Sequence, residues 1–346
     1  MRIAKSVRRL VAYTPGEQPK AKNVVKLNTN ENPYPPSPKC KAVLKGFDLD
    51  RLRRYPDPEF AALRAELAKL NRTRPENVFV GNGSDEVLAL AAKAFVENDG
   101  EIGSLDPSYS LYKTLAAIRD VKWVGFDPSV PRSPIPSRVS LFLWTNPNAP
   151  TGTLAAPETI AAFARRFRGV VIVDEAYADF SSRNCMSLAT AAANRNVIVM
   201  RTFSKSYSLA GLRVGYCVGP KDLIDALYKV KDSYNIDAIA QAVALAAAKD
   251  QAWMKANVAK VVKTRTRFTA QLVRRGWDVL PSESNFLFAR PAHIRADRLF
   301  AALRERNIFV RYFKGPKTGD RVRITIGTDA QMKKLLKALD ELDLPA

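Results

Sequence analysis

Histidine and cysteine are scarce in this 346-residue sequence. The single histidine, His293, lies in a Pro- and Arg-flanked segment near the C-terminus, where we expect a surface role. A histidine-based catalytic triad or a histidine-rich metal site is therefore almost excluded, and we predict no metal centre. The three cysteines, Cys40, Cys185 and Cys217, form no CxxC pair, so the sequence suggests neither a zinc site nor a disulfide framework. This cysteine usage fits a reducing compartment.

Long apolar segments are also absent. The amino terminus, MRIAKSVRRLVAY, is basic but lacks the apolar stretch of a signal peptide, and no uncharged apolar run later in the chain is long enough to span a membrane. We therefore expect a cytoplasmic protein with no membrane partner. Hydrophobic residues make up 47% and charged residues 26% of the chain, which is typical of a globular protein.

Acidic residues are few relative to basic ones, with 34 Asp and Glu against 55 Lys and Arg, a net charge of +21. Such an excess favours anionic ligands, although most of it is interpreted as a solvated basic surface. The richest run, residues 255–275, has the pattern of the polar side of an amphipathic helix. No nucleic-acid-binding module is recognisable, so no nucleic-acid partner is expected, and a basic regulator is kept only as a remote alternative.

Short apolar runs alternate with helical patterns between about residues 78 and 220, which predicts a mostly parallel sheet covered by helices. The predicted strands are 78–80, 102–105, 121–126, 139–144, 170–173, 197–203 and 214–218, and the predicted helices are 85–96, 109–118, 157–168 and 221–230. Beyond residue 240, a long helical stretch precedes strands at 277–280, 285–289, 308–311 and 322–326 and a helix at 296–306. The first forty or so residues are predicted to form an extended arm. The expected fold class is α/β, with domain boundaries at 1–45 (arm and part of the small domain), 46–240 (large domain) and 241–346 (small α+β domain).

Three polar residues follow predicted strands of the large domain. Lys205, in TFSKSYSLAGLR, would be a salt-bridged surface residue in the simplest interpretation, but a partly buried amine near other cations can attack a carbonyl group. Asp174 ends the apolar strand of VVIVDEAYADF, and Asn146 follows the strand before WTNPNAPTG. Because ligands bind at the carboxyl ends of strands in open α/β sheets, we expect these three side chains to lie together.

A glycine-containing turn before a helix, in VGNGSDEVLAL, predicts an anion site. The backbone N–H groups of Gly83, Ser84 and Asp85 would point at the anion from the start of the helix, and the helix dipole would add to the attraction. Ser84 or Asp85 would otherwise be an ordinary helix cap. One phosphate group would suit this turn.

An ordered set of segments carries a resemblance to a known family. The segments are YTPGEQPK, KLNTNENPYPPSP, RRYPDP, GNGSDEVL, NPNAPTG, DEAYADF, RTFSKSYSLAGLRVGY and RITIGT. Almost end to end, they resemble the fold-type-I pyridoxal-phosphate aminotransferases, and among these the histidinol-phosphate aminotransferase family most closely. The resemblance implies pyridoxal 5′-phosphate as cofactor, a homodimer, and a fold-type-I transferase with a large and a small domain.

The resemblance also implies roles for individual residues. Lys205 would form the Schiff base with the cofactor and then act as general acid and base. Asp174 would face the pyridine nitrogen, and Asn146 and Tyr177 the ring oxygen, while Tyr109 would stack on the ring. The residues implied to hold the phosphate are Ser84, Asp85, Thr202, Ser204, Arg213 and, from the other subunit, Tyr55.

Two arginines suggest the substrate. Arg323, in VRITIGT, and Arg311, in VRYF, lie on neighbouring predicted strands, where two guanidinium groups can converge on one dianion. With Tyr34 closing over the group and Asn146 nearby, the predicted reaction is transamination of L-histidinol phosphate with 2-oxoglutarate in histidine biosynthesis. An aromatic amino-acid aminotransferase and a threonine-phosphate decarboxylase are the alternatives on the same scaffold.

The sequence departs from the family pattern in three places. Ala149 replaces an asparagine of the usual NPNNPTG, and the connection around residues 127–138 is short and rich in proline. Ser206 and Ser208 stand where alanine and glycine are commoner, and the sequence provides no account of them.

Overall fold

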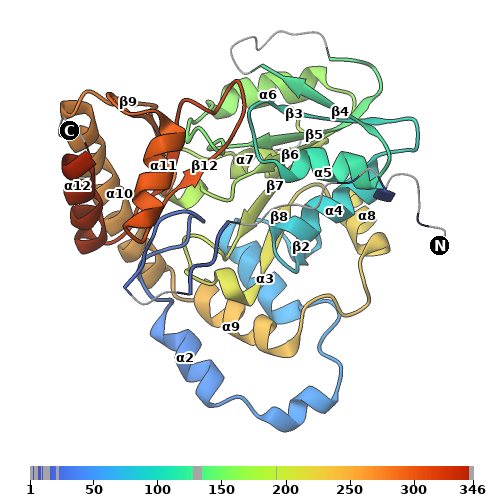
Figure 1. Cartoon of the computed structure of the whole chain (residues 1–346). Helices are drawn as coiled ribbons and strands as arrows, with labels where there is room; N and C mark the ends of the chain where they lie inside the picture. The colour runs from blue at the N-terminus through green and yellow to red at the C-terminus, as the bar shows by residue number, and fades with distance from the viewer. Residues whose placement is uncertain are drawn as a thin grey trace.

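A seven-stranded sheet forms the centre of the larger part of the molecule (Figure 1). The computed structural model describes residues 3, 7–8, 10, 16–20, 23–127, 135–191 and 193–342. In spatial order the strands are β2 (Val78–Gly81), β8 (Gly215–Val218), β7 (Val197–Thr202), β6 (Val170–Asp174), β5 (Val139–Thr145), β3 (Glu101–Leu105) and β4 (Lys122–Phe126). Strands β7, β6, β5, β3 and β4 run parallel, and β8 is antiparallel to both of its neighbours. The predicted mostly parallel sheet is therefore confirmed.

Both faces of this sheet are largely apolar, because side chains of a strand alternate between the faces and the central strands β5, β6 and β7 are rich in branched and aromatic residues. On β6, Ile172 packs on one side, with helices α4 (Ser84–Phe95), α5 (Leu111–Ile118) and α8 (Lys221–Val230). Val171 and Val173 pack on the other side. There the covering helices are α3 (Ala61–Leu70), α6 (Pro157–Arg166), α7 (Met186–Thr190) and α9 (Ala238–Ala248). These helices cover the two faces of the sheet and leave the carboxyl ends of β5, β6 and β7 accessible to a ligand.

A smaller α+β part is built on four antiparallel strands, in the order β12 (Arg311–Tyr312), β13 (Val322–Thr325), β10 (Phe286–Arg290) and β9 (Asp278–Val279). Helices α10 (Gln251–Arg274), α11 (Ala296–Glu305) and α12 (Asp329–Leu342) lie beside it (Figure 1). The arm joins this part, since β1 (Val25–Lys26) pairs in parallel with β11 (Ile308–Phe309). Met254 belongs to the apolar core of the large part and Val261 to that of the small part, so the two cores meet within α10.

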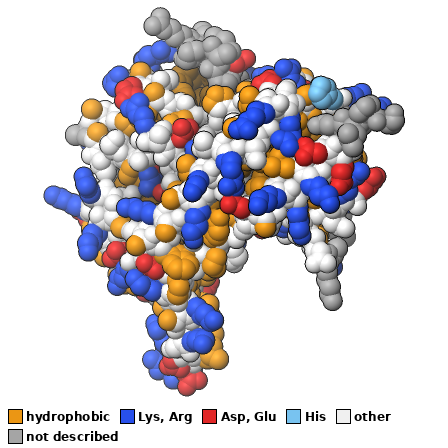
Figure 2. Space-filling model, turned by 90° about the vertical axis from the view of Figure 1, so that its left-hand side faces the viewer, with side chains coloured by type: hydrophobic (Ala, Val, Ile, Leu, Met, Phe, Trp, Pro, Cys, Tyr) orange, Lys and Arg blue, Asp and Glu red, His pale blue; other side chains and the backbone are white. Residues whose placement is uncertain are grey.

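The helix α2 (Pro38–Lys45) and the 3-10 turn η1 (Leu49–Arg53) extend away from the body at the bottom of Figure 1 and of Figure 2. The described part of the chain covers one side of α2, with Cys40 packed on the core near α9. Leu44, Leu49 and Leu52 are 53%, 71% and 50% exposed. These fractions are large for leucine, so we call residues 38–55 the projecting segment and return to it below.

Two of the predicted elements differ from the structure, and a third predicted feature lies mostly outside the described residues. The predicted strand 308–311 is divided into β11 and β12, which pair in different sheets. The predicted long helix after residue 240 is interrupted at Lys249–Asp250, giving α9 and α10. Most of the proline-rich connection falls on residues 128–134, outside the described residues. Among the described residues, no helix combines the length and the apolar character needed to cross a membrane.

Candidate active site

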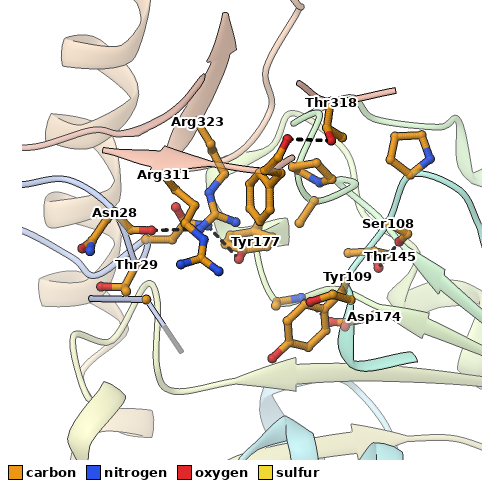
Figure 3. A pocket seen from close by; sticks show the side chains of 18 of the residues that line it. Asn28, Thr29, Ser108, Tyr109, Thr145, Asp174, Tyr177, Arg311, Thr318 and Arg323 are labelled. Carbon is orange, nitrogen blue, oxygen red and sulfur yellow. Dashed lines mark hydrogen bonds between the residues drawn. The ribbon is translucent and has the colours of Figure 1, made fainter. Parts of the chain in front are cut away.

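A cavity of about 560 Å³ lies where the carboxyl ends of β5, β6 and β7 face the arm and the small domain. The large domain contributes Thr145, Asp174 and Thr202, each the last residue of its strand. Figure 3 shows Asn28 and Thr29 of the arm on one side of this space and Arg311 and Arg323 of the small domain above it. Three parts of the chain that are distant in sequence therefore enclose one site.

The Asp174 carboxylate is the most buried charge of the cavity, with only 4% of the residue exposed. Burial raises its pKa from 3.8 to about 6, although the Tyr112 hydroxyl and the Ala176 N–H donate hydrogen bonds that oppose this shift. The Tyr112 hydroxyl lies 2.8 Å from Asp174 Oδ2 and also contacts Thr145. The carboxylate is thus held in one orientation at the end of a central strand.

The Lys205 amine enters the cavity from the loop after β7. Its Nζ donates to the Thr29 carbonyl oxygen at 3.3 Å and lies 5.8 Å from the centre of the Tyr177 ring. The Tyr177 hydroxyl accepts a hydrogen bond of 3.0 Å from Asn30 Nδ2. The arm therefore contacts both the amine and the phenol.

A buried polar network supports the Lys205 loop and gives Ser206 a structural role. The Ser206 hydroxyl donates to Asp179 Oδ2, and Asp179 lies 3.7 Å from Arg201, which donates twice to Glu175 Oε2 at 2.8 and 3.0 Å. Glu175 also accepts from a backbone N–H. The segment after β6 thereby presents Asp174 to the cavity and Glu175 to this network, which ties it to the loop that carries Lys205.

Ser208 occupies a position suited to glycine. Its φ of 60° is left-handed, a conformation that strains a residue with a Cβ atom, and its buried hydroxyl has no hydrogen-bond partner among the described residues. This strain is the physical reason that a glycine would be favoured at this position.

The start of α4 forms a cradle of hydrogen-bond donors. Gly83 has a φ of 80°, which favours glycine, and a Cβ atom there would lie 2.6 Å from Arg213 Nη2 and would displace the guanidinium group from its present position. Arg213 Nη1 lies 3.4 Å from Ser204 Oγ and Nη2 lies 3.2 Å from an Asp85 carboxylate oxygen. Ser84, Thr202 and Ser204 line the same end of the cavity. The helix dipole, the backbone N–H groups and Arg213 together favour an anion here.

A second positive group faces the cavity from the small domain. Arg311 and Arg323 are opposite each other in the pairing of β12 with β13, so their side chains project from the same face of the sheet (Figure 3). The Arg323 Nη2 donates to the Asn28 carbonyl oxygen at 3.0 Å. The expectation that these arginines lie on neighbouring strands is confirmed, and both reach the cavity.

The structure brings most of the predicted residues together, but not Asn146 or Tyr34. The Asn146 side chain exchanges hydrogen bonds of 2.8 and 3.0 Å with the Ala155 backbone, and the cavity wall at this loop is formed instead by Ala149 and Pro150. The Tyr34 ring packs beside the core of the small domain, 4.9 Å from Lys260 Nζ. Neither side chain is among the described residues that line the cavity, so the structure does not bring them to the site, and their predicted contacts with a cofactor or substrate stay predictions.

Tyr55 is also distant from the cavity of its own chain. It is 80% exposed on the projecting segment, where its ring stacks on Tyr234 at 4.3 Å. This position leaves the predicted contact from another subunit untested.

Sequence reasoning missed Tyr112 and Asn30, which hold Asp174 and Tyr177. Tyr112 has the pattern of an apolar residue of α5, and its side chain is completely buried. Asn30 belongs to the asparagine-rich arm, whose composition predicted an extended segment but not its partners. Its φ of 55° is left-handed, a conformation in which asparagine is enriched, so the residue type itself was the one sequence signal of a special backbone position.

Comparison with known proteins identifies the family. The profile of the family described as "Aminotransferase class I and II" matches residues 22–339. This chain belongs to that family. Histidinol-phosphate aminotransferase 1 of Nostoc sp. is 42% identical over 343 residues, covering 97% of each chain, and the histidinol-phosphate aminotransferase of Syntrophotalea carbinolica is 43% identical, covering 98% of this chain and 99% of its own. The crystal structure of histidinol-phosphate aminotransferase from Sinorhizobium meliloti in complex with pyridoxal-5′-phosphate superposes with a TM-score of 0.87, 25% identity and coverage of 98% and 97% of the two chains. The predicted fold class of this aminotransferase, α/β of fold type I, is thereby confirmed.

The raised pKa of Asp174 predicts a pH dependence of stability in the protein freed of ligands. The folded state retains this proton to a higher pH than the unfolded chain, so the free energy of unfolding should fall as the pH rises from 3.8 towards about 6. Asp174→Asn removes the effect, and its stability relative to wild type should improve by roughly 3 kcal/mol at most across this range. Urea unfolding at several pH values measures the difference, with Asp99→Asn at an exposed position as control. A difference that stays constant with pH would contradict the prediction.

Proposed function

We propose that this aminotransferase uses pyridoxal 5′-phosphate to convert L-histidinol phosphate and 2-oxoglutarate into imidazole-acetol phosphate and L-glutamate, a step of histidine biosynthesis. The observation that carries the proposal is one cavity with an amine, a buried carboxylate and two separate anion-binding groups. The relatives at 42% and 43% identity over nearly their whole length support the same activity. A cytoplasmic location agrees with the three buried cysteines, all of which are free thiols.

The residues present fit pyridoxal phosphate. The cradle at the start of α4, which a Cβ atom at Gly83 would fill, suits the phosphate, held by Ser84, Thr202, Ser204, Arg213 and the Asp85 N–H. Asp174 would face the pyridine nitrogen, Tyr109 the ring, and Tyr177 the ring oxygen, while Lys205 would hold the cofactor covalently. Because Ala149 offers no side-chain hydrogen bond at the wall, Tyr177 and its partner Asn30 provide the polar contact there.

The bound cofactor supplies an electron-accepting ring that allows a proton to leave the α-carbon of an amino donor. Asp174 would favour this by holding a proton at the ring nitrogen, since a carboxylate at this buried position is stabilised by a facing cation. Once the amine of the donor has displaced Lys205 from the cofactor, the freed Lys205 Nζ would take the proton from the α-carbon and deliver it to the cofactor carbon on the other side of the transferred nitrogen. The Thr29 carbonyl oxygen contacts Lys205 Nζ and would orient it during this transfer.

Arg311 and Arg323 would bind the substrate anion at the opposite end of the cavity. In a two-step exchange, the donor phosphate and the distal carboxylate of 2-oxoglutarate occupy the same place in turn. Two guanidinium groups accept either anion, because both anions present oxygen atoms to planar donors.

Lys205→Ala should reduce kcat roughly 10³-fold or more, because this amine would both hold the cofactor and move the proton. The folded state should be little affected, since the amine makes one hydrogen bond, to a backbone oxygen. Borohydride treatment followed by peptide mass analysis should place the reduced cofactor adduct on Lys205. Lys229→Ala, on an exposed position of α8, controls for the loss of a lysine. An adduct on another lysine would refute the assignment.

Arg323→Ala should lower kcat/KM for histidinol phosphate by on the order of 3 kcal/mol, and far less for unphosphorylated histidinol, because it removes a charged donor to the phosphate. Steady-state kinetics with both donors measure the split. Arg290→Ala on β10, whose guanidinium group pairs with Asp278, is the matched control. Faster turnover of phenylalanine or tyrosine than of histidinol phosphate by the wild-type enzyme would favour an aromatic aminotransferase, and release of carbon dioxide from a phosphorylated amino acid would favour a decarboxylase.

A homodimer joined through the projecting segment is part of the proposal. That segment exposes four large hydrophobic side chains, Leu44, Leu49, Leu52 and Tyr55, within 12 residues of sequence, and such exposure favours an interface. Tyr55 would then reach the phosphate of the partner subunit.

We expect the double variant Leu49→Glu and Leu52→Glu to sediment as a monomer at micromolar concentration, because charges would be buried at the interface. Ile118→Glu, at an equally exposed position on α5, should remain dimeric. Tyr55→Phe should weaken cofactor retention by about 1 kcal/mol, the value of one hydrogen bond. A wild-type monomer with full activity would overturn this part of the proposal.

A further inference from the structure

The two arginines above the cavity, Arg311 and Arg323, place two positive charges side by side. Arg311 and Arg323 are direct partners in the antiparallel pairing of β12 and β13, and like charges at such positions repel each other. Repulsion would spread the two guanidinium groups unless some other contact holds them. An anion that binds between them must meet both groups at once, so their separation before binding affects affinity.

One aromatic ring contacts both guanidinium groups. The Phe313 ring centre lies 5.3 Å from the Arg311 guanidinium carbon and 5.1 Å from that of Arg323. Both distances are within the range of cation–π attraction, and Phe313 itself lines the cavity. Arg323 also lies 5.3 Å from the Phe286 ring, which is completely buried, so one arginine is packed on two rings. Phe313 is the ring that the two arginines share.

The loop that begins at Phe313 is fixed at both ends. The Thr318 hydroxyl donates to the Phe313 carbonyl oxygen at 3.0 Å, and the Gly319 N–H donates to the Gly315 carbonyl oxygen at 2.8 Å. Lys317 Nζ crosses to the large domain, where it lies 3.0 Å from the Asp106 carboxylate. The ring therefore has a defined position relative to the cavity, because its loop is closed on itself and anchored across the two domains.

We propose that Phe313 is a specificity-determining positioning residue, which holds Arg311 and Arg323 at the separation that one dianionic group requires. The negative face of the ring offsets the repulsion between the two cations without neutralising them, so they remain able to bind an anion. An acidic residue at this position would also hold the arginines, but it would compete with the substrate. The inference rests on the proposed function and adds a residue that determines preference for phosphate and for a distal carboxylate.

The test compares Phe313→Leu with Phe313→Tyr in the holoenzyme. Leucine retains an apolar side chain but not the ring, so KM for histidinol phosphate and for 2-oxoglutarate should each rise roughly tenfold, with little change in kcat. KM for unphosphorylated histidinol should change much less, because that donor presents no dianion. Tyrosine retains the ring and should restore the wild-type preference for the phosphorylated donor.

Lys317→Met separates the effect of the ring from that of the loop. This variant removes the anchor to Asp106 and leaves Phe313 in place, so the preference for the phosphorylated donor should fall less than in Phe313→Leu. The proposal is overturned if Phe313→Leu retains the wild-type preference for the phosphorylated donor, or if KM rises equally for histidinol phosphate and for histidinol. It is also overturned if Lys317→Met lowers the preference as much as Phe313→Leu does. Arg323→Ala, measured in parallel, separates a failure of the proposed substrate site from a failure of the role of Phe313. If this variant keeps the wild-type preference for the phosphorylated donor, the substrate site itself is wrong, and not only the role of Phe313.

Discussion

A carboxylate at the buried end of a central strand is costly unless a proton, a cation or several donors meet it, and Asp174 is in that position. Much of the site can be understood as a response to this constraint. Tyr112, from a helix on one face of the sheet, and the Ala176 N–H each donate to the carboxylate, yet burial still raises its pKa to about 6. The carboxylate therefore has a strong remaining preference for a positively charged partner, and the cavity opens directly beside it. A ring nitrogen that can hold a proton satisfies this requirement.

The same segment of chain stabilises its surroundings in two directions. Asp174 faces the cavity, whereas the next residue, Glu175, points into the network that reaches Ser206 through Arg201 and Asp179. The loop with Lys205 is thus fixed to the strand that bears Asp174 by ionic contacts on the side away from the ligand. Because both catalytic candidates depend on one set of buried charges, their relative position is defined before a ligand binds.

Periodicity and order along the chain allowed the fold to be predicted, because strands buried on both faces must be apolar throughout and their ends must meet at one edge. Lys205 and Asp174 could be found for the same reason, since each follows or ends an apolar strand, whereas Arg213 was assigned only through the resemblance to the family. Asn146 also follows an apolar strand, but it lies at a tight turn, where its amide group bonds to the Ala155 backbone. Ala149 lines the cavity in its place. Tyr112 and Asn30 could not be assigned, because their partners are distant in sequence and each has an ordinary alternative, as a core aromatic residue or as a turn residue. The position of Tyr34 beside the core of the small domain could not be predicted, because the path of the arm depends on β1 and β11, two strands of only two residues each.

A few of the cations behind the net charge of +21 lie at the cavity, where their positions determine which anions can bind. Arg213 marks one end of the cavity and the pair Arg311 and Arg323 the other, so a molecule that bridges them must carry negative charge at both ends. The general basic surface would raise the local concentration of such anions without distinguishing among them. Selection of one anion over another depends on the geometry of the groups that bind it, and the two ends of the cavity differ in this geometry. At the Arg213 end, the donors are backbone and hydroxyl groups at a helix start, which cannot rearrange much between ligands. At the other end, two long side chains are held against an aromatic ring, and this arrangement can accept a phosphate and a carboxylate in turn. The Arg213 end therefore suits an anion that stays bound, such as the phosphate of a cofactor. The end with Arg311 and Arg323 suits the anions of substrates that bind one after the other.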